Sequence, residues 1–138
     1  MIQRIQSIWL LLAAMFNAVT FRFPFYSGDW SKDTLPAVID LNASTTIWLT
    51  ILTVLDGLLA VITIFLFKNR KLQLRLTYLG VILTMVLLTM YFLDISDFYS
   101  GNVAIWAIFY FAILACYIFA ARGIWRDQKL IKSMDRLR

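Results

Sequence analysis

One carboxylate in the middle of a long apolar stretch is the side chain best placed to do chemistry in this sequence. Asp56 lies near the centre of residues 47–67, which are mostly apolar. A carboxylate at the centre of a bilayer costs about 2.5–3.5 kcal/mol on insertion scales, so Asp56 should face protein or water. It could transfer a proton or a cation, or it could stay protonated and hold helices in register through a hydrogen bond to Asn17 or a threonine. We favour the structural use, because no second intramembrane acid and no histidine is present to pass a proton onward.

The residue types on which most enzymes rely are scarce. The chain has no histidine and a single cysteine, Cys116. Without histidine, the chain cannot form a Ser-His-Asp or Cys-His nucleophilic site or bind zinc or haem through histidine. With one cysteine, it cannot form an internal disulfide. No CxxC pair, P-loop or GxGxxG motif is present either. We therefore expect a protein that is not an enzyme and that uses no cofactor and no metal, and we identify no small-molecule substrate.

Four long apolar stretches must position Asp56. Hydrophobic residues make up 62% of the 138 residues, more than a soluble domain of this size can bury. About 20 mainly apolar residues cross a bilayer as a helix, and residues 5–23, 47–67, 74–93 and 103–121 meet this requirement. No convincing cleavage site follows the first stretch, so we read it as a retained span and not as a signal peptide. The sequence predicts an all-α, antiparallel bundle of four transmembrane helices, a single integral membrane domain over residues 1–138.

Small residues indicate where the first two helices would pack. Thr53 and Gly57 belong to a narrow stripe of small residues in the second stretch, and Ala14 and Ala18 form a small-xxx-small pair in the first. Such stripes let helices approach closely and mark the interior of a membrane bundle. We expect the two stripes to face each other.

Depth in the bilayer identifies partners for Asp56. Counting about 1.5 Å of rise per residue from the ends of the stretches places Asn17, Thr84 and Tyr110 near the same level. Asn17 lies beside the small-residue pair of the first stretch. Asp56 and Asn17 are therefore the predicted intramembrane polar site.

Basic residues orient the predicted bundle. All but two of the 13 Lys and Arg lie before the first stretch, between the second stretch and the first residues of the third, or after the fourth. Cytoplasmic segments of membrane proteins carry such an excess, so both ends of the chain should be cytoplasmic. The predicted basic cytoplasmic face consists of Lys68, Arg70, Lys71, Arg75, Arg122, Arg126, Lys129, Lys132, Arg136 and Arg138.

The cytoplasmic tail, residues 122–138, has apolar residues at roughly helical spacing with basic residues between them. This pattern predicts a basic amphipathic helix that lies along the headgroups or projects as an extension of the fourth span. Its charge favours a bilayer with anionic headgroups as a partner. Docking on an acidic partner such as ribosomal RNA is the alternative. Because no RNA-binding motif is present, we expect no direct contact with nucleic acid, and proximity to the ribosome stays open.

The tetrapeptide FYSG occurs twice on the predicted outer side, at residues 25–28 and 98–101. Each copy follows an outward-going stretch, so the two could record a repeated hairpin, or they could match by chance. The outer loop 24–46 that contains the first copy should lie on the membrane or cap the bundle.

Three segments on the predicted cytoplasmic side carry a resemblance to a known family. They are MIQRIQS at residues 1–7, NRKLQLR at residues 69–75 and RGIWRDQKLIKSMDRLR at residues 122–138. Over its whole length the chain resembles small four-helix inner-membrane proteins of the Bacteroidota that are catalogued as a domain of unknown function. The resemblance implies a location in the bacterial inner (cytoplasmic) membrane. It brings no established activity and therefore assigns no functional residues.

Two classes of function are compatible with these features. The first is a non-enzymatic accessory or scaffolding subunit of a larger inner-membrane complex, with protein-export or insertion machinery as a host to consider. Other membrane proteins would then be its partners. The second is a small proton- or ion-coupled transporter that uses Asp56. A cavity that admits water as far as Asp56 would favour the transporter.

Overall fold

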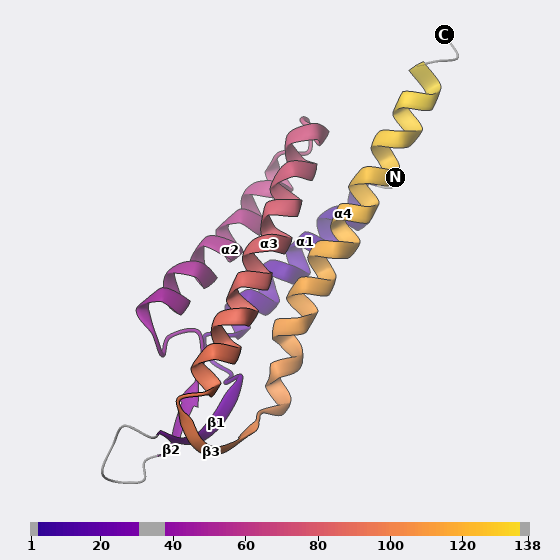
Figure 1. Ribbon diagram of the computed structural model, residues 1–138. Helices are drawn as coiled ribbons and strands as arrows, with labels where there is room; N and C mark the ends of the chain where they lie inside the picture. Colours follow the sequence, from indigo (N-terminus) through magenta and orange to yellow (C-terminus); the bar gives the residue numbers. More distant parts are fainter. Residues whose placement is uncertain (1–2, 31–37, 136–138) are drawn as a thin grey trace.

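The structure is a computed structural model that describes residues 3–30 and 38–135. Within these residues the chain forms four α-helices that run alternately up and down, with three strands gathered at one end (Figure 1). The helices are α1 (Gln3–Val19), α2 (Ile47–Phe65), α3 (Arg70–Ile95) and α4 (Ile108–Asp135), and a 3₁₀ turn, Ile105–Ala107, precedes α4. The strands are β1 (Tyr26–Trp30), β2 (Val38–Leu41) and β3 (Phe98–Val103).

The four helices form a closed ring in which each helix packs against two others. α1 lies between α2 and α4, and α3 lies between the same two helices on the opposite side. The termini of the described chain and the α2–α3 turn lie at one end of the bundle, and the sheet lies at the other (Figure 1). Arg70 at the start of α3 and Gln128 near the end of α4 meet at the first end, where the Gln128 amide donates a 2.8 Å hydrogen bond to the Arg70 carbonyl.

Polar side chains share the interior of the bundle with apolar ones, and many large apolar side chains face outward. The buried polar side chains are Gln6, Asn17, Thr20, Thr53, Asp56, Thr63, Gln73, Thr77, Thr84 and Asp127. The exposed apolar side chains include Ile8, Leu11 and Met15 of α1, Ile51, Leu55 and Leu58 of α2, Ile82, Met85 and Val86 of α3, and Phe111 and Ile118 of α4. In a soluble bundle, each helix turns its apolar stripe toward the core and its polar side chains toward water. The pattern in this bundle is typical of helices whose surroundings are apolar.

Three of the described helical segments are long and apolar enough to cross a membrane: Ile47–Phe65, Arg70–Ile95 and Ile105–Ser133. The first helix is shorter than the predicted span 5–23, since α1 has 17 residues and ends at Val19. Thr20 ends it by donating a 2.7 Å hydrogen bond from its hydroxyl to the Asn17 carbonyl in the last turn. Pro24 lies just beyond and disfavours helical backbone in the residue before it.

The four predicted helices are confirmed, but the fold is mostly and not entirely α-helical, because the outer segments form an antiparallel sheet with the order β2-β1-β3. The strands are short, and β1 pairs with β3 across a long stretch of sequence. A local hairpin pattern in the sequence therefore does not predict the pairing of β1 with β3. The sheet caps the bundle through Phe25 and Leu41, which are fully buried against Tyr91 and Tyr110. The ring of Phe25 lies 5.1 Å from that of Tyr91 and 5.0 Å from that of Tyr110, centroid to centroid.

The two FYSG copies meet at their glycines in this sheet. Gly28 of β1 faces Gly101 of β3 in an antiparallel register. A Cβ atom on Gly28 would lie 2.3 Å from the Ser100 carbonyl oxygen, and one on Gly101 would lie 2.6 Å from the Ser27 carbonyl oxygen. Both strands therefore need glycine where their backbones cross.

Of the two arrangements predicted for the tail, the structure has the extension of the fourth span. α4 runs without a break through Ile108–Asp135, so the described part of the tail continues the helix and projects beyond its neighbours (Figure 1). No proline interrupts this region, and its one glycine, Gly123, lies where α4 passes close to Gln6 of α1.

Candidate functional site

Asp56 connects all four helices. Its side chain is 1% exposed, and its two carboxyl oxygens have partners on α1 and α3. The Asn17 amide donates to Oδ2 at 3.1 Å, and the Thr84 hydroxyl lies 3.2 Å from Oδ1. From α4, the Tyr117 hydroxyl donates a 2.7 Å hydrogen bond to the backbone carbonyl of Asp56. One residue of α2 is thus tied to each of the other three helices.

The geometry at Thr84 fits a neutral acid. The Thr84 oxygen lies 2.8 Å from the Gly80 carbonyl and 3.2 Å from Asp56 Oδ1, but the hydroxyl has only one proton. If that proton goes to the nearer Gly80 carbonyl, the Thr84 oxygen is free to accept the proton of a neutral Asp56 carboxyl. Asn17 then donates to the other carboxyl oxygen, and every polar atom of the Asp56 side chain is satisfied.

Gly57, one of the predicted packing residues, allows α1 and α2 to approach closely at this point. A Cβ atom on Gly57 would lie 2.8 Å from Asn17 Oδ1, so the absence of a side chain leaves room for the Asn17 amide. Thr53 is buried one turn before Gly57 and donates to the Leu49 carbonyl at 2.6 Å.

The two members of the small-residue pair predicted on α1 differ in their burial. Ala14 is half-buried, whereas Ala18 is exposed on the outer surface. The buried face of α1 instead includes Leu10, Ala13 and Asn17, since spacings of three and four residues follow one side of a helix. Ala18 is therefore not a helix-packing residue of the bundle interior, because Asn17 occupies the inward position beside it.

Gly80 and Tyr117 belong to the site and were not singled out from the sequence. The Tyr117 ring lies directly over Gly80, where a Cβ atom would be 2.4 Å from ring atom Cε1. The available signal was the spacing of small and polar residues along α3 at Gln73, Thr77, Gly80 and Thr84. All four are buried, and the stripe marks the inner face of α3.

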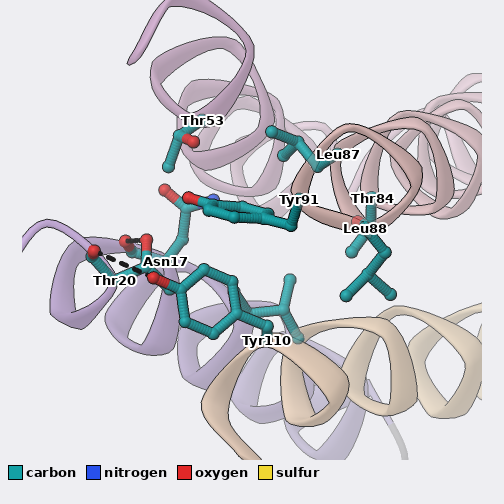
Figure 2. A pocket seen from close by; sticks show the side chains of 9 residues that line it. Asn17, Thr20, Thr53, Thr84, Leu87, Leu88, Tyr91 and Tyr110 are labelled. Atoms are coloured by element: carbon teal, nitrogen blue, oxygen red, sulfur yellow. Dashed lines mark hydrogen bonds between the residues drawn. The ribbon is translucent and has the colours of Figure 1, made fainter. Parts of the chain in front are cut away.

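A small cavity lies beside the Asp56 network, on the side toward the sheet, and both polar and apolar side chains line it. Its volume is about 10 Å³, room for about one water molecule. Figure 2 shows the Tyr91 hydroxyl pointing across it toward the α1 side chains of Asn17 and Thr20. Tyr91 is 1% exposed, and its hydroxyl has no hydrogen-bond partner among the described residues. Asp56 does not line the cavity, although its partners Asn17 and Thr84 do.

The second buried acid of the described chain, Asp127, lies at the other end of the bundle. Gln6 of α1 donates a hydrogen bond from its side-chain amide to Asp127 Oδ2 of α4. Acidic side chains do not cluster elsewhere: in the described residues, no group of three or more His, Cys, Asp or Glu could hold a metal ion.

The predicted basic face is assembled at the end of the bundle that holds the α2–α3 turn and the C-terminal part of α4. Lys68, Arg70, Lys71 and Arg75 lie in or just after that turn. The members on α4 are Arg122, Arg126, Lys129 and Lys132, and all four are exposed. The two remaining predicted members, Arg136 and Arg138, lie outside the described residues.

Comparison with known proteins identifies the family. The family model described as a domain of unknown function (DUF4293) matches residues 2–137. The match covers nearly the whole chain, so the protein belongs to this family. No curated protein and no solved structure matches the chain.

Proposed function

We propose that this protein is a non-enzymatic accessory or scaffolding subunit of a larger complex in the bacterial inner membrane. The observation that carries the proposal is the position of Asp56, whose side chain and carbonyl link α2 to α1, α3 and α4. A residue engaged in this way holds the bundle together. It therefore supports a rigid unit, as a scaffold requires.

The proposed membrane placement has all four helices crossing the bilayer and both termini in the cytoplasm. The outward face of α1 carries Ile8, Leu11 and Met15, so this shorter helix suits a lipid environment as well as the other three do. Seventeen residues rise about 25 Å, and a short helix can be accommodated by local thinning of the bilayer. The basic residues gathered at one end support a cytoplasmic orientation of that end. The inner membrane is the compartment that the resemblance noted from the sequence implies.

The alternative is a proton- or ion-coupled transporter, and one observation favours it. A buried intramembrane acid lies next to a small cavity whose lining includes Asn17 and Thr84, and buried acids beside cavities occur in proton pathways. Against it, the cavity has room for about one water molecule, and side chains of α1 and α3 already occupy both carboxyl oxygens of Asp56. The scaffold is therefore the better supported of the two.

Purification in mild detergent from the native membrane separates the two functions. We expect the wild-type protein and Asp56→Asn to bring down the same larger complex in stoichiometric amounts. Asparagine can donate to the Thr84 oxygen and accept from Asn17, so the bundle should survive the change. A protein that purifies alone and drives pH-dependent flux in vesicles, with the flux lost in Asp56→Asn, would establish the transporter instead.

A further inference from the structure

A cleft opens at the basic end of the molecule between the start of α3 and the end of α4. Its volume is about 690 Å³, and a second hollow of about 580 Å³ shares Arg70, Lys71 and Ile131 with it. We name the first hollow the basic cleft. Its lining residues are Arg70, Lys71, Trp125, Gln128, Lys129, Ile131 and Lys132.

The cations of the basic cleft are arranged as two pairs on opposite walls. Arg70 and Lys71 begin α3, and Lys129 and Lys132 lie on α4, spaced so that both fall on one side of that helix. No acidic side chain is among the described residues that line the cleft. Four positive charges in one hollow make a site for a ligand with more than one negative charge.

The walls of the basic cleft are tied together by the chain itself. Gln128 donates a 2.8 Å hydrogen bond to the Arg70 carbonyl, which joins the start of α3 to α4 between the two pairs of cations. Lys129 places its ammonium 5.8 Å from the centre of the Trp125 ring. The cleft therefore has fixed sides, unlike an array of separate surface lysines.

The apolar part of the cleft indicates what kind of anion it suits. Trp125 and Ile131 contribute half-exposed apolar surface to the same hollow as the four cations. A free phosphate gains nothing from this apolar surface, and a nucleic acid can stack a base on Trp125 but gains nothing from Ile131. A phospholipid presents phosphate and hydrocarbon together. Tryptophan also favours the level of the headgroups at a membrane surface.

We propose that the basic cleft binds one anionic phospholipid whose headgroup carries two phosphates, as in cardiolipin. Each pair of cations holds one phosphate, and the start of the acyl chains lies against Trp125 and Ile131. Basic pockets between membrane helices on the cytoplasmic side are suited to such headgroups. The inference rests on the membrane placement proposed above and not on the scaffolding role.

Retention of lipid by the full-length protein tests the site. Two variants remove the same charge from the same helix: Lys129→Gln with Lys132→Gln inside the cleft, and Arg122→Gln with Arg126→Gln outside it. Both lose the same general attraction to an anionic surface. In native mass spectra of detergent-solubilised protein titrated with cardiolipin, we expect the cleft variant to bind at least about tenfold more weakly than the control variant, given about 1 kcal/mol per basic residue near a phosphate.

Three results would overturn the proposal. The first is equal cardiolipin binding by the cleft variant and the control variant. The second is a thermal stabilisation by soluble pyrophosphate that matches the stabilisation by cardiolipin, which would make the site one for a free anion. The third is a short RNA that displaces bound cardiolipin. Each experiment uses purified protein, so failure here leaves the scaffolding role and the orientation in the membrane to their own tests.

Discussion

Replacing Gly80 with alanine is expected to destabilise the bundle by about 1–3 kcal/mol, the usual cost of forcing extra atoms into a packed interior. The added Cβ would lie 2.4 Å from Cε1 and 2.8 Å from Cζ of Tyr117. The ring cannot move aside cheaply, because Tyr117 is fully buried and its hydroxyl is bonded to the Asp56 carbonyl. Equilibrium unfolding in mixed micelles measures the loss of free energy.

The sign of the change in unfolding free energy shows whether the alanine at position 80 meets the Tyr117 ring. In an ordinary helix interior, glycine to alanine stabilises by about 1 kcal/mol through helix propensity alone. A second variant, Tyr117→Leu, removes the ring that the alanine meets. If the contact is the cause, Gly80→Ala should cost much less in the Tyr117→Leu background, so the two changes should not add. A Gly80→Ala protein that unfolds at higher denaturant than the wild type would contradict the packing of α3 against α4 at this point.

Replacing Asp56 with leucine is expected to cost about 1–3 kcal/mol of unfolding free energy. The change leaves the buried Asn17 amide without its acceptor and Thr84 without its second partner. Asp56→Asn keeps a donor and an acceptor at the same place and should cost less than about 1 kcal/mol. The same unfolding experiment compares the two variants.

A matched control for the leucine variant lies on the outer face of α3. Thr89 is exposed, and its hydroxyl bonds only within its own helix, to the Met85 carbonyl at 2.9 Å. Thr89→Leu makes a similar polar-to-apolar change on the exposed surface and should be neutral or slightly stabilising in micelles. If Asp56→Leu were as harmless as Thr89→Leu, the carboxyl would not be holding the helices together.

The helical part of this fold could be predicted from the sequence because apolar length alone indicates it. Depth counting also placed Asn17 and Thr84 near Asp56, and the structure brings all three side chains together. This works because the rise of a helix is fixed, so residues at equal distances from the ends of antiparallel helices meet. It could not give the rotation of each helix, which is why Ala18 was assigned inward although it is exposed.

The sheet and the contact with Tyr117 could not be predicted in the same way. β1 pairs with β3, and Tyr117 bonds to Asp56, through contacts between residues far apart in the sequence. The recurring FYSG was visible, but only the register showed that Gly28 and Gly101 face each other. Nothing in the sequence around Tyr117 marked it as the aromatic residue that covers Gly80.

Thiol labelling in intact cells tests the central claim, a membrane bundle whose basic end is cytoplasmic. The native Cys116 is buried and should react little with the reagent, so the labelling of an introduced cysteine can be measured above the signal of Cys116. Tyr99→Cys places a thiol at the sheet end, where Tyr99 is 88% exposed, and Lys68→Cys places one in the α2–α3 turn. With a membrane-impermeant reagent applied to cells whose outer membrane is permeabilised, we expect labelling of Tyr99→Cys at once and of Lys68→Cys only after the inner membrane is opened. Labelling of Lys68→Cys in cells with an intact inner membrane, or of both variants alike, would contradict the account.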